Sequence, residues 1–148
     1  MSFTKVCVLI TGILLLGPLN AVGQSTAGSS TPFVVENYYK VRWGYAEEFI
    51  DLWKKNHYPL LKKAQQKGDI VRIKAEKPRQ HSSEDSRWDF RVIIEFKSMQ
   101  NAFDPNLTEP YKKQLYPDLE KLKKEEQHRF QLLLAHWDVL TEEVNLDQ

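Results

Sequence analysis

The chain has 148 residues, of which 41% are hydrophobic, 28% are charged and 11% are aromatic. This length fits one domain, and this composition excludes a disordered chain and a multi-span membrane protein. Lys and Arg number 21 against 20 Asp and Glu, a net charge of +1. Because phosphate binding needs a basic excess, no nucleic-acid partner is expected.

Residues 1–23 have the pattern of a secretory signal peptide. Lys5 precedes an apolar run over residues 6–17, and small residues end the segment at Gly23. The apolar run is shorter than the ~20 residues that span a bilayer. We therefore expect cleavage near Gly23, a secreted or periplasmic protein, and no membrane contact after cleavage. A cut after Ala27 and an uncleaved anchor are the alternatives.

The only cysteine, Cys7, lies within this leader. The cleaved protein can therefore have no disulfide, no cysteine nucleophile and no thiolate metal site. Residues 24–32 are rich in Ser, Thr and Gly and are expected to form a flexible linker.

The folded region begins with a predicted strand over residues 33–42, which is rich in β-branched and aromatic side chains. Residues 45–67 then have helical spacing, and Pro59 should interrupt that helix near His57 because proline cannot donate the backbone hydrogen bond. Gly68 is a suitable C-terminal stop. The expected buried stripe of this helix contains Phe49, Leu52, Trp53, Asn56, Leu60 and Ala64.

Two alternating segments, residues 69–77 and 87–97, predict a hairpin joined by the polar loop 78–86. Their apolar parities should face the helices. Those residues are Val71, Ile73, Ala75, Trp88, Phe90, Val92, Ile94 and Phe96. The opposite parity is charged, with both signs in balance. It contains Arg72, Lys74, Glu76, Asp89, Arg91 and Glu95.

The last third is predicted to hold a short turn over residues 99–103 and a helix start at Thr108, Glu109 and Pro110. A longer helix should follow over residues 118–130, and a strand over residues 132–141, although an extended helix also fits its first residues. The predicted stripe of the long helix contains Leu115, Leu119, Leu122, Glu126 and Phe130.

The predicted element order is β-α-β-β-α-β, which is the ferredoxin-like order of an α+β domain over residues 33–144, followed by a short tail, 145–148. We expect a four-stranded antiparallel sheet with two helices on one face. Loss of Lys5 with the leader leaves 20 basic and 20 acidic residues. A neutral protein with a charged, sign-balanced sheet face is well suited to pair with a second copy.

Two segments carry a resemblance to a known family. They are ENYYKVRWG at residues 36–44 and AEEFIDLWKKNHYPLLKKAQQKGDI at residues 46–70. With the charged hairpin that follows, they resemble the dimeric α/β-barrel superfamily. The resemblance implies a homodimer whose two sheets pack face to face. That superfamily includes cofactor-independent monooxygenases, haem enzymes, isomerases and stress-response proteins, so the resemblance predicts the fold and leaves the chemistry open.

His57, beside Pro59, is the candidate catalytic residue, as a proton-handling group in a pocket wall. The alternative is a histidine that is hydrogen-bonded at the helix interruption. Five aromatic residues are candidates to line a pocket for a flat organic ligand, or else they form an aromatic core. They are Tyr39, Trp53, Tyr58, Trp88 and Trp137.

His136 and Asp138 lie two apart on the last strand and form either an orienting pair or an ion pair on the charged sheet face. No histidine or carboxylate spacing predicts a metal site, and no phosphate-binding or haem motif predicts a cofactor. The residues thus allow three hypotheses. The first is an exported ligand-binding homodimer, an oxygenase-like enzyme without a cofactor. The others are a non-enzymatic binding or sensing module and a structural envelope dimer.

Overall fold

The computed structural model of the protein describes residues 32–80 and 82–147. The predicted signal peptide, and the predicted linker apart from Pro32, lie outside the described residues. Within the described part, no helix combines the length and the apolar character needed to cross a membrane.

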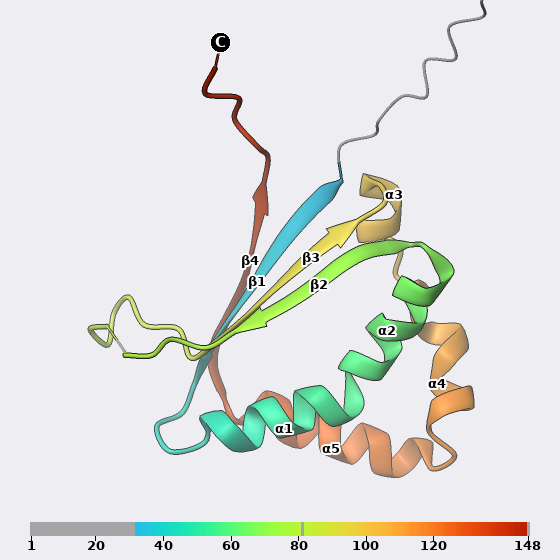
Figure 1. The fold of residues 1–148 in the computed structure, drawn as a ribbon. Coiled ribbons are helices and arrows are strands. Elements are labelled where there is room, and N and C mark those ends of the chain that lie inside the picture. The colour runs from blue at the N-terminus through green and yellow to red at the C-terminus, as the bar shows by residue number, and fades with distance from the viewer. Residues whose placement is uncertain (1–31, 81, 148) are drawn as a thin grey trace, which may run out of the picture.

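Four strands form one antiparallel sheet in the order β2-β3-β1-β4. The helices form a layer on one face of this sheet (Figure 1). The predicted α+β ferredoxin-like class is therefore confirmed. The elements are β1 (Phe33–Val41), α1 (Ala46–Asn56), α2 (Tyr58–Lys67), β2 (Ile70–Glu76), β3 (Phe90–Phe96), α3 (Met99–Ala102), α4 (Glu109–Leu115), α5 (Leu119–Gln131) and β4 (Leu133–Thr141).

Proline and glycine divide the first helical segment as predicted. Helix α1 ends at Asn56, and α2 begins at Tyr58 with Pro59 in its first turn, where the missing N–H is not needed. Gly68 ends α2 in the left-handed region, at a φ of 86°. The interruption leaves His57 at the junction between the two helices.

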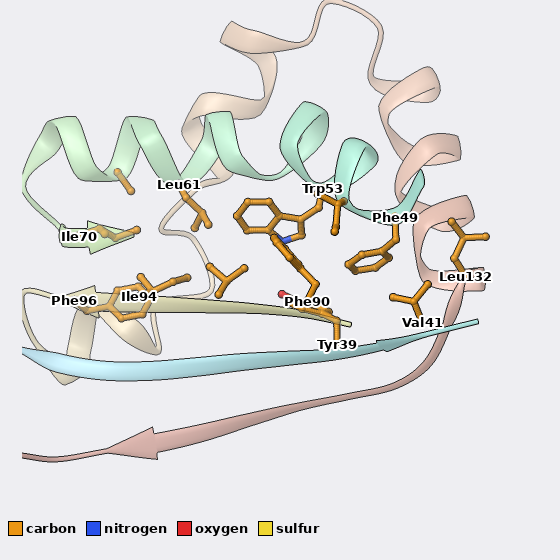
Figure 2. Packing of buried hydrophobic residues seen from close by; sticks show 13 residues of the cluster. Tyr39, Val41, Phe49, Trp53, Leu61, Ile70, Phe90, Ile94, Phe96 and Leu132 are labelled. Carbon is orange, nitrogen blue, oxygen red and sulfur yellow. The ribbon is translucent and has the colours of Figure 1, made fainter. Parts of the chain in front are cut away.

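The core lies between the helical layer and the sheet, as Figure 2 shows for the labelled side chains. Phe49 and Trp53 of α1 pack against Tyr39 of β1 and Phe90 of β3. Alternate residues of β3 are buried along its whole length, which confirms the predicted period of two. The core therefore joins α1 to the two central strands.

Strand β2 departs from the predicted pattern near its start. The pairing with β3 shifts between Ile70 and Arg72, so Val71 is an extra residue on this strand. Ile70 is buried instead, and Val71 is 52% exposed. The prediction that Val71 faces the helices is wrong, because the bulge changes the parity that the sequence alternation implied.

The predicted parity is also wrong at Trp88, where the alternation has not yet begun. The amide of Asp89 donates to the carbonyl of Tyr39, and its carboxylate accepts from the amide of Val41. These contacts draw the chain out of the regular pattern before Phe90. Arg87 is consequently buried, and Trp88 lies on the opposite face of the sheet from the core.

In α5 the buried residues are Leu122 and Arg129, which are seven apart and therefore share one face of the helix. Phe130, a residue of the predicted apolar stripe, is 57% exposed, and Leu119 is also exposed. The predicted stripe is wrong at both residues. The packing of α5 against α1 selects a face rotated from the one that the apolar residues suggest.

Candidate functional site

The sheet face opposite the helices holds an internally paired charge network. Arg91 donates to Glu36 at 3.2 Å, to the Tyr38 hydroxyl at 3.2 Å and, through Nε, to Glu76 at 3.0 Å. Hydrogen bonds from Lys74 and Arg91 lower the pKa of Glu76 to about 2. The balanced charges predicted for this face thus pair largely within one chain.

Aromatic side chains lie beside this network. Tyr38 stacks on Trp137 with ring centroids 5.4 Å apart, and Trp88 meets Tyr38 edge-on at 5.9 Å. Val139 lies next to them on β4, opposite Glu36 in the strand pairing. We call Tyr38, Trp88, Arg91, Trp137 and Val139 the open-face patch. Because its charges are paired and part of its surface is apolar, burying this patch in an interface would have a low desolvation free energy.

The other predicted pocket residues lie on the helix side of the sheet. Tyr39 of β1 stacks on His136 of β4 at 4.4 Å, and Trp53 of α1 lies 5.6 Å from the His57 ring. Tyr58 also stacks on Trp53, at 6.1 Å, with an exposed ring. The sheet therefore separates Tyr39, Trp53 and Tyr58 from Trp88 and Trp137, and the five do not line one cavity.

We call Tyr39, Trp53, His57, Arg129 and His136 the helix-side cluster. Burial, followed by the nearby charges of Arg129, Lys112 and His136, lowers the pKa of His57 to about 4. Among the described residues no side chain hydrogen-bonds to the His57 ring. His57 is thus a neutral imidazole near pH 7, with ring nitrogens open to another partner.

Arg129 is the member of this cluster that the sequence analysis missed. Its side chain comes from the last turn of α5, and the residue is only 4% exposed. Within residues 32–80 and 82–147 it forms no ion pair, and its Nε is buried without a hydrogen-bond partner. The seven-residue spacing from Leu122 was the available signal, because it places Arg129 on the buried face of the helix.

The remaining polar atoms of the cluster are mostly donors. The indole N–H of Trp53 is buried and acts on the pKa of the nearby Tyr39 hydroxyl, although it forms no hydrogen bond of regular geometry with any described residue. Burial raises the pKa of Tyr39 to about 12, so its phenol keeps its proton. A guanidinium, an indole N–H and a phenol together favour an oxygen-bearing acceptor over another donor.

His136 and Asp138 form the predicted pair, with 3.2 Å between Nε2 and Oδ1. They lie opposite Tyr39 and Asn37 in the strand pairing, and Tyr39 belongs to the core. The pair is therefore on the helix side, and its predicted place on the charged face is wrong. The sequence could not show which parity of β4 the helices would cover.

His57 does not line the main surface hollows of the described residues, although its chain neighbours Asn56 and Tyr58 each line one. One, of about 830 Å³, lies beside Trp43, Glu47 and Ile50, and another, of about 320 Å³, lies between Asn56, Tyr116 and neighbouring residues of α5. Over the same residues, no group of three His, Cys, Asp or Glu side chains is placed to hold a metal ion. The helix-side cluster is thus a covered group of polar atoms rather than the wall of a wide cleft.

Comparison with solved structures identifies the fold. The chain is similar to a dimeric ferredoxin-like protein from an uncultured marine organism, with a TM-score of 0.51 and 9% identity over 78% of this chain and 92% of that one. The chain has the ferredoxin-like fold of that protein. The fold that the resemblance to the dimeric α/β-barrel superfamily implied is therefore confirmed.

Two further structures are similar at lower scores. A NIPSNAP family protein from Agrobacterium tumefaciens has a TM-score of 0.46 and 10% identity, over 77% of this chain and 94% of that one. An antibiotic biosynthesis monooxygenase has a TM-score of 0.44 and 10% identity, over 76% and 99%. No protein-family model and no curated protein sequence matches the chain.

The lowered pKa of His57 predicts an acid-sensitive fold. Protonation is harder in the folded state, so the stability linked to His57 is present above pH 6.5 and is lost as the pH falls through about 4. We expect His57 to account for about 2–3 kcal/mol of this loss. Urea unfolding at pH 7 and pH 4 should show a smaller difference for His57→Gln than for the wild type.

His128→Gln is the matched control, because His128 is an exposed histidine paired with Glu48 at the surface. It should leave the pH difference as it is in the wild type. His136, whose pKa burial also lowers, keeps part of the acid sensitivity in every variant. Equal pH differences for the wild type and His57→Gln would contradict the assignment.

Proposed function

We propose that the protein is an exported homodimer that binds a small organic ligand on the helix side of each sheet. Two copies pair through their open-face patches, with the sheets face to face. Support comes from the exposed side chains of Trp137 and Val139 in the patch, from the internal pairing of its charges and from the neutrality of the chain without its leader. Low net charge reduces the repulsion between two copies.

We propose His57 as the proton-handling group of that ligand site, in an enzyme that works without a cofactor, like the oxygenases of the resembling superfamily. The observation that carries this proposal is a neutral, unpaired imidazole held next to buried donors. A neutral imidazole can accept a proton from an electron-rich substrate, whose anion the surrounding donors then stabilise. His136, held by Asp138, is the second imidazole of the cluster.

A structural dimer without a ligand is the second candidate. It is favoured by the well-packed core and by the absence of His57 from the hollows delimited in the described residues. Under this reading His57 is a partly buried residue at a helix junction, and its lowered pKa only costs stability in acid.

Thermal-shift screening of aromatic compounds, followed by oxygen consumption with each hit, separates these functions. We expect compounds that raise the melting temperature and are turned over, with His57→Ala keeping the binding and losing the turnover. His128→Ala should keep both. Binding without turnover would indicate a non-enzymatic binding module, and a screen in which no compound shifts the melting temperature would indicate the structural dimer.

The predicted export has its own test. Sequencing the N-terminus of exported protein should find Gln24 as the first residue, which would support the proposed cleavage.

A further inference from the structure

We infer that the helix-side cluster takes an anionic ligand, of the aromatic carboxylate class, and that Arg129 is the residue that anchors its charge. The inference rests on the proposed function, since it names the ligand class of that same site. It starts from a cation that the fold buries without a counter-ion among the described residues.

A buried guanidinium is costly unless a carboxylate or other acceptors compensate it. This chain shows the usual solution at Arg87, which is 1% exposed and lies between the carboxylates of Glu84 and Asp89. Arg129 is buried to nearly the same degree and has neither an ion pair nor a hydrogen bond with any other described residue. The charge of one buried arginine is therefore compensated by carboxylates, and the charge of the other is not.

The charged groups around Arg129 do not fill this role. Glu126 is near enough to act on its pKa but forms no salt bridge with it in the described structure. Asp138 is paired with His136. The C-terminal end of α5 contributes only a partial negative charge. The other neighbours that act on His57 are Lys112, which is positively charged, and His136, and neither supplies a negative charge.

The surroundings of the guanidinium suit a flat ligand. Its central carbon lies 4.6 Å from the centroid of the Phe130 ring and 5.7 Å from that of Phe49. The buried Nε1 of Trp53, which lies near the Tyr39 hydroxyl, is a further donor in the same cluster. Aromatic faces beside a guanidinium without an ion pair match a ring that carries a carboxylate.

Such a ligand would also improve His57 as a base. After burial, the charge of Arg129 has the largest effect in lowering the pKa of His57. A carboxylate bound to Arg129 offsets that charge, which favours the protonated imidazole. The anion would then prepare the proton acceptor that its own reaction needs.

The test compares carboxylates with their uncharged amides: benzoate with benzamide, salicylate with salicylamide, and 2-naphthoate with 2-naphthamide. Isothermal titration with the wild type should give about tenfold tighter binding of at least one carboxylate, because hydrogen bonds to a charged group are the stronger ones. Arg129→Met should bring the two members of that pair to within about twofold, mainly by weakening the carboxylate. Lys124→Met removes an exposed lysine from the same helix and is the matched control. This variant should still bind the carboxylate more tightly than its amide.

A second measurement covers the fold. Without ligand, Arg129→Met should melt at the same or a higher temperature than the wild type, because it removes an uncompensated buried charge. A strongly lowered melting temperature would show that Arg129 is structural and would overturn the inference. Equal binding of carboxylate and amide by the wild type would also overturn the inference, but it would leave the proposed ligand site supported. Binding of neither compound, together with an empty aromatic screen, would overturn the inference and the proposed function together.

Discussion

Replacing Arg87 with alanine is expected to lower the free energy of unfolding by about 3 kcal/mol, because the change breaks a buried ion pair by removing one partner. The Arg87 Nε donates to Glu84 at 2.7 Å, and its guanidinium pairs with Asp89 and lies 4.1 Å from the centroid of the Trp43 ring. Without Arg87, the mostly buried carboxylate of Asp89 keeps only its bond from the Val41 amide. The connection between β2 and β3 would then lose the ion pairs that join Glu84 to Asp89 through Arg87, while its contacts with Lys40 and Val41 of β1 remain.

Arg72→Ala is the matched control, since Arg72 also pairs with a carboxylate on a strand. Its side chain is exposed and its contact with Glu95 is 3.4 Å long. Exposed pairs of this kind contribute about 0–1 kcal/mol. Urea unfolding of both variants at pH 7 measures the difference. Similar losses for the two arginines would contradict the role assigned to the buried pair.

Val139→Asp is expected to convert the proposed homodimer into a monomer. Val139 is 39% exposed, lies in the open-face patch and pairs with Glu36 across β1 and β4. An aspartate there places a second carboxylate beside Glu36 and buries it against the partner sheet. Two-fold symmetry introduces the charge twice. An uncompensated buried charge costs several kcal/mol, so the dissociation constant should rise by about a thousandfold or more.

Light scattering on purified protein measures this change directly, with the wild type giving the mass of two chains. Val144→Asp adds the same charge beyond the end of β4, at a residue that is 70% exposed, and should remain dimeric. Urea unfolding of the Val139→Asp monomer should still be cooperative, because the substitution lies outside the core. A wild type that is monomeric at micromolar concentration would refute the proposed dimer, and a dimeric Val139→Asp would refute this interface.

Local backbone rules made much of the fold predictable. Pro59 and Gly68 ended α1 and α2 where they should, because a missing N–H and a left-handed φ are properties of single residues. Asp118 caps α5 through the amide of Lys121, a contact within one turn. Strand β3 was predictable because both its neighbours and the helical layer enforce one alternation. Such signals depend on the nearest residues in the chain.

The candidate site was predictable only in part. Tyr39, Trp53 and His57 do lie on one side of the sheet, since the strand and the helix that carry them have strong periodicity. Trp88 was expected on that side as well, but contacts of Asp89 with β1 bend the chain before the alternation begins. A tertiary hydrogen bond thus reversed a parity that looked regular in the sequence.

The sequence by itself determined the element order, the helix boundaries and the balance of charge, because these depend on residue type and short spacing. Only the tertiary structure decided which cations are compensated. Arg87 and Arg129 have the same side chain and nearly the same burial. Arg87 forms ion pairs with two carboxylates, whereas Arg129 forms none with any described residue. The Coulomb energy of a buried charge depends on distances between segments that are remote in the chain, and only folding sets those distances.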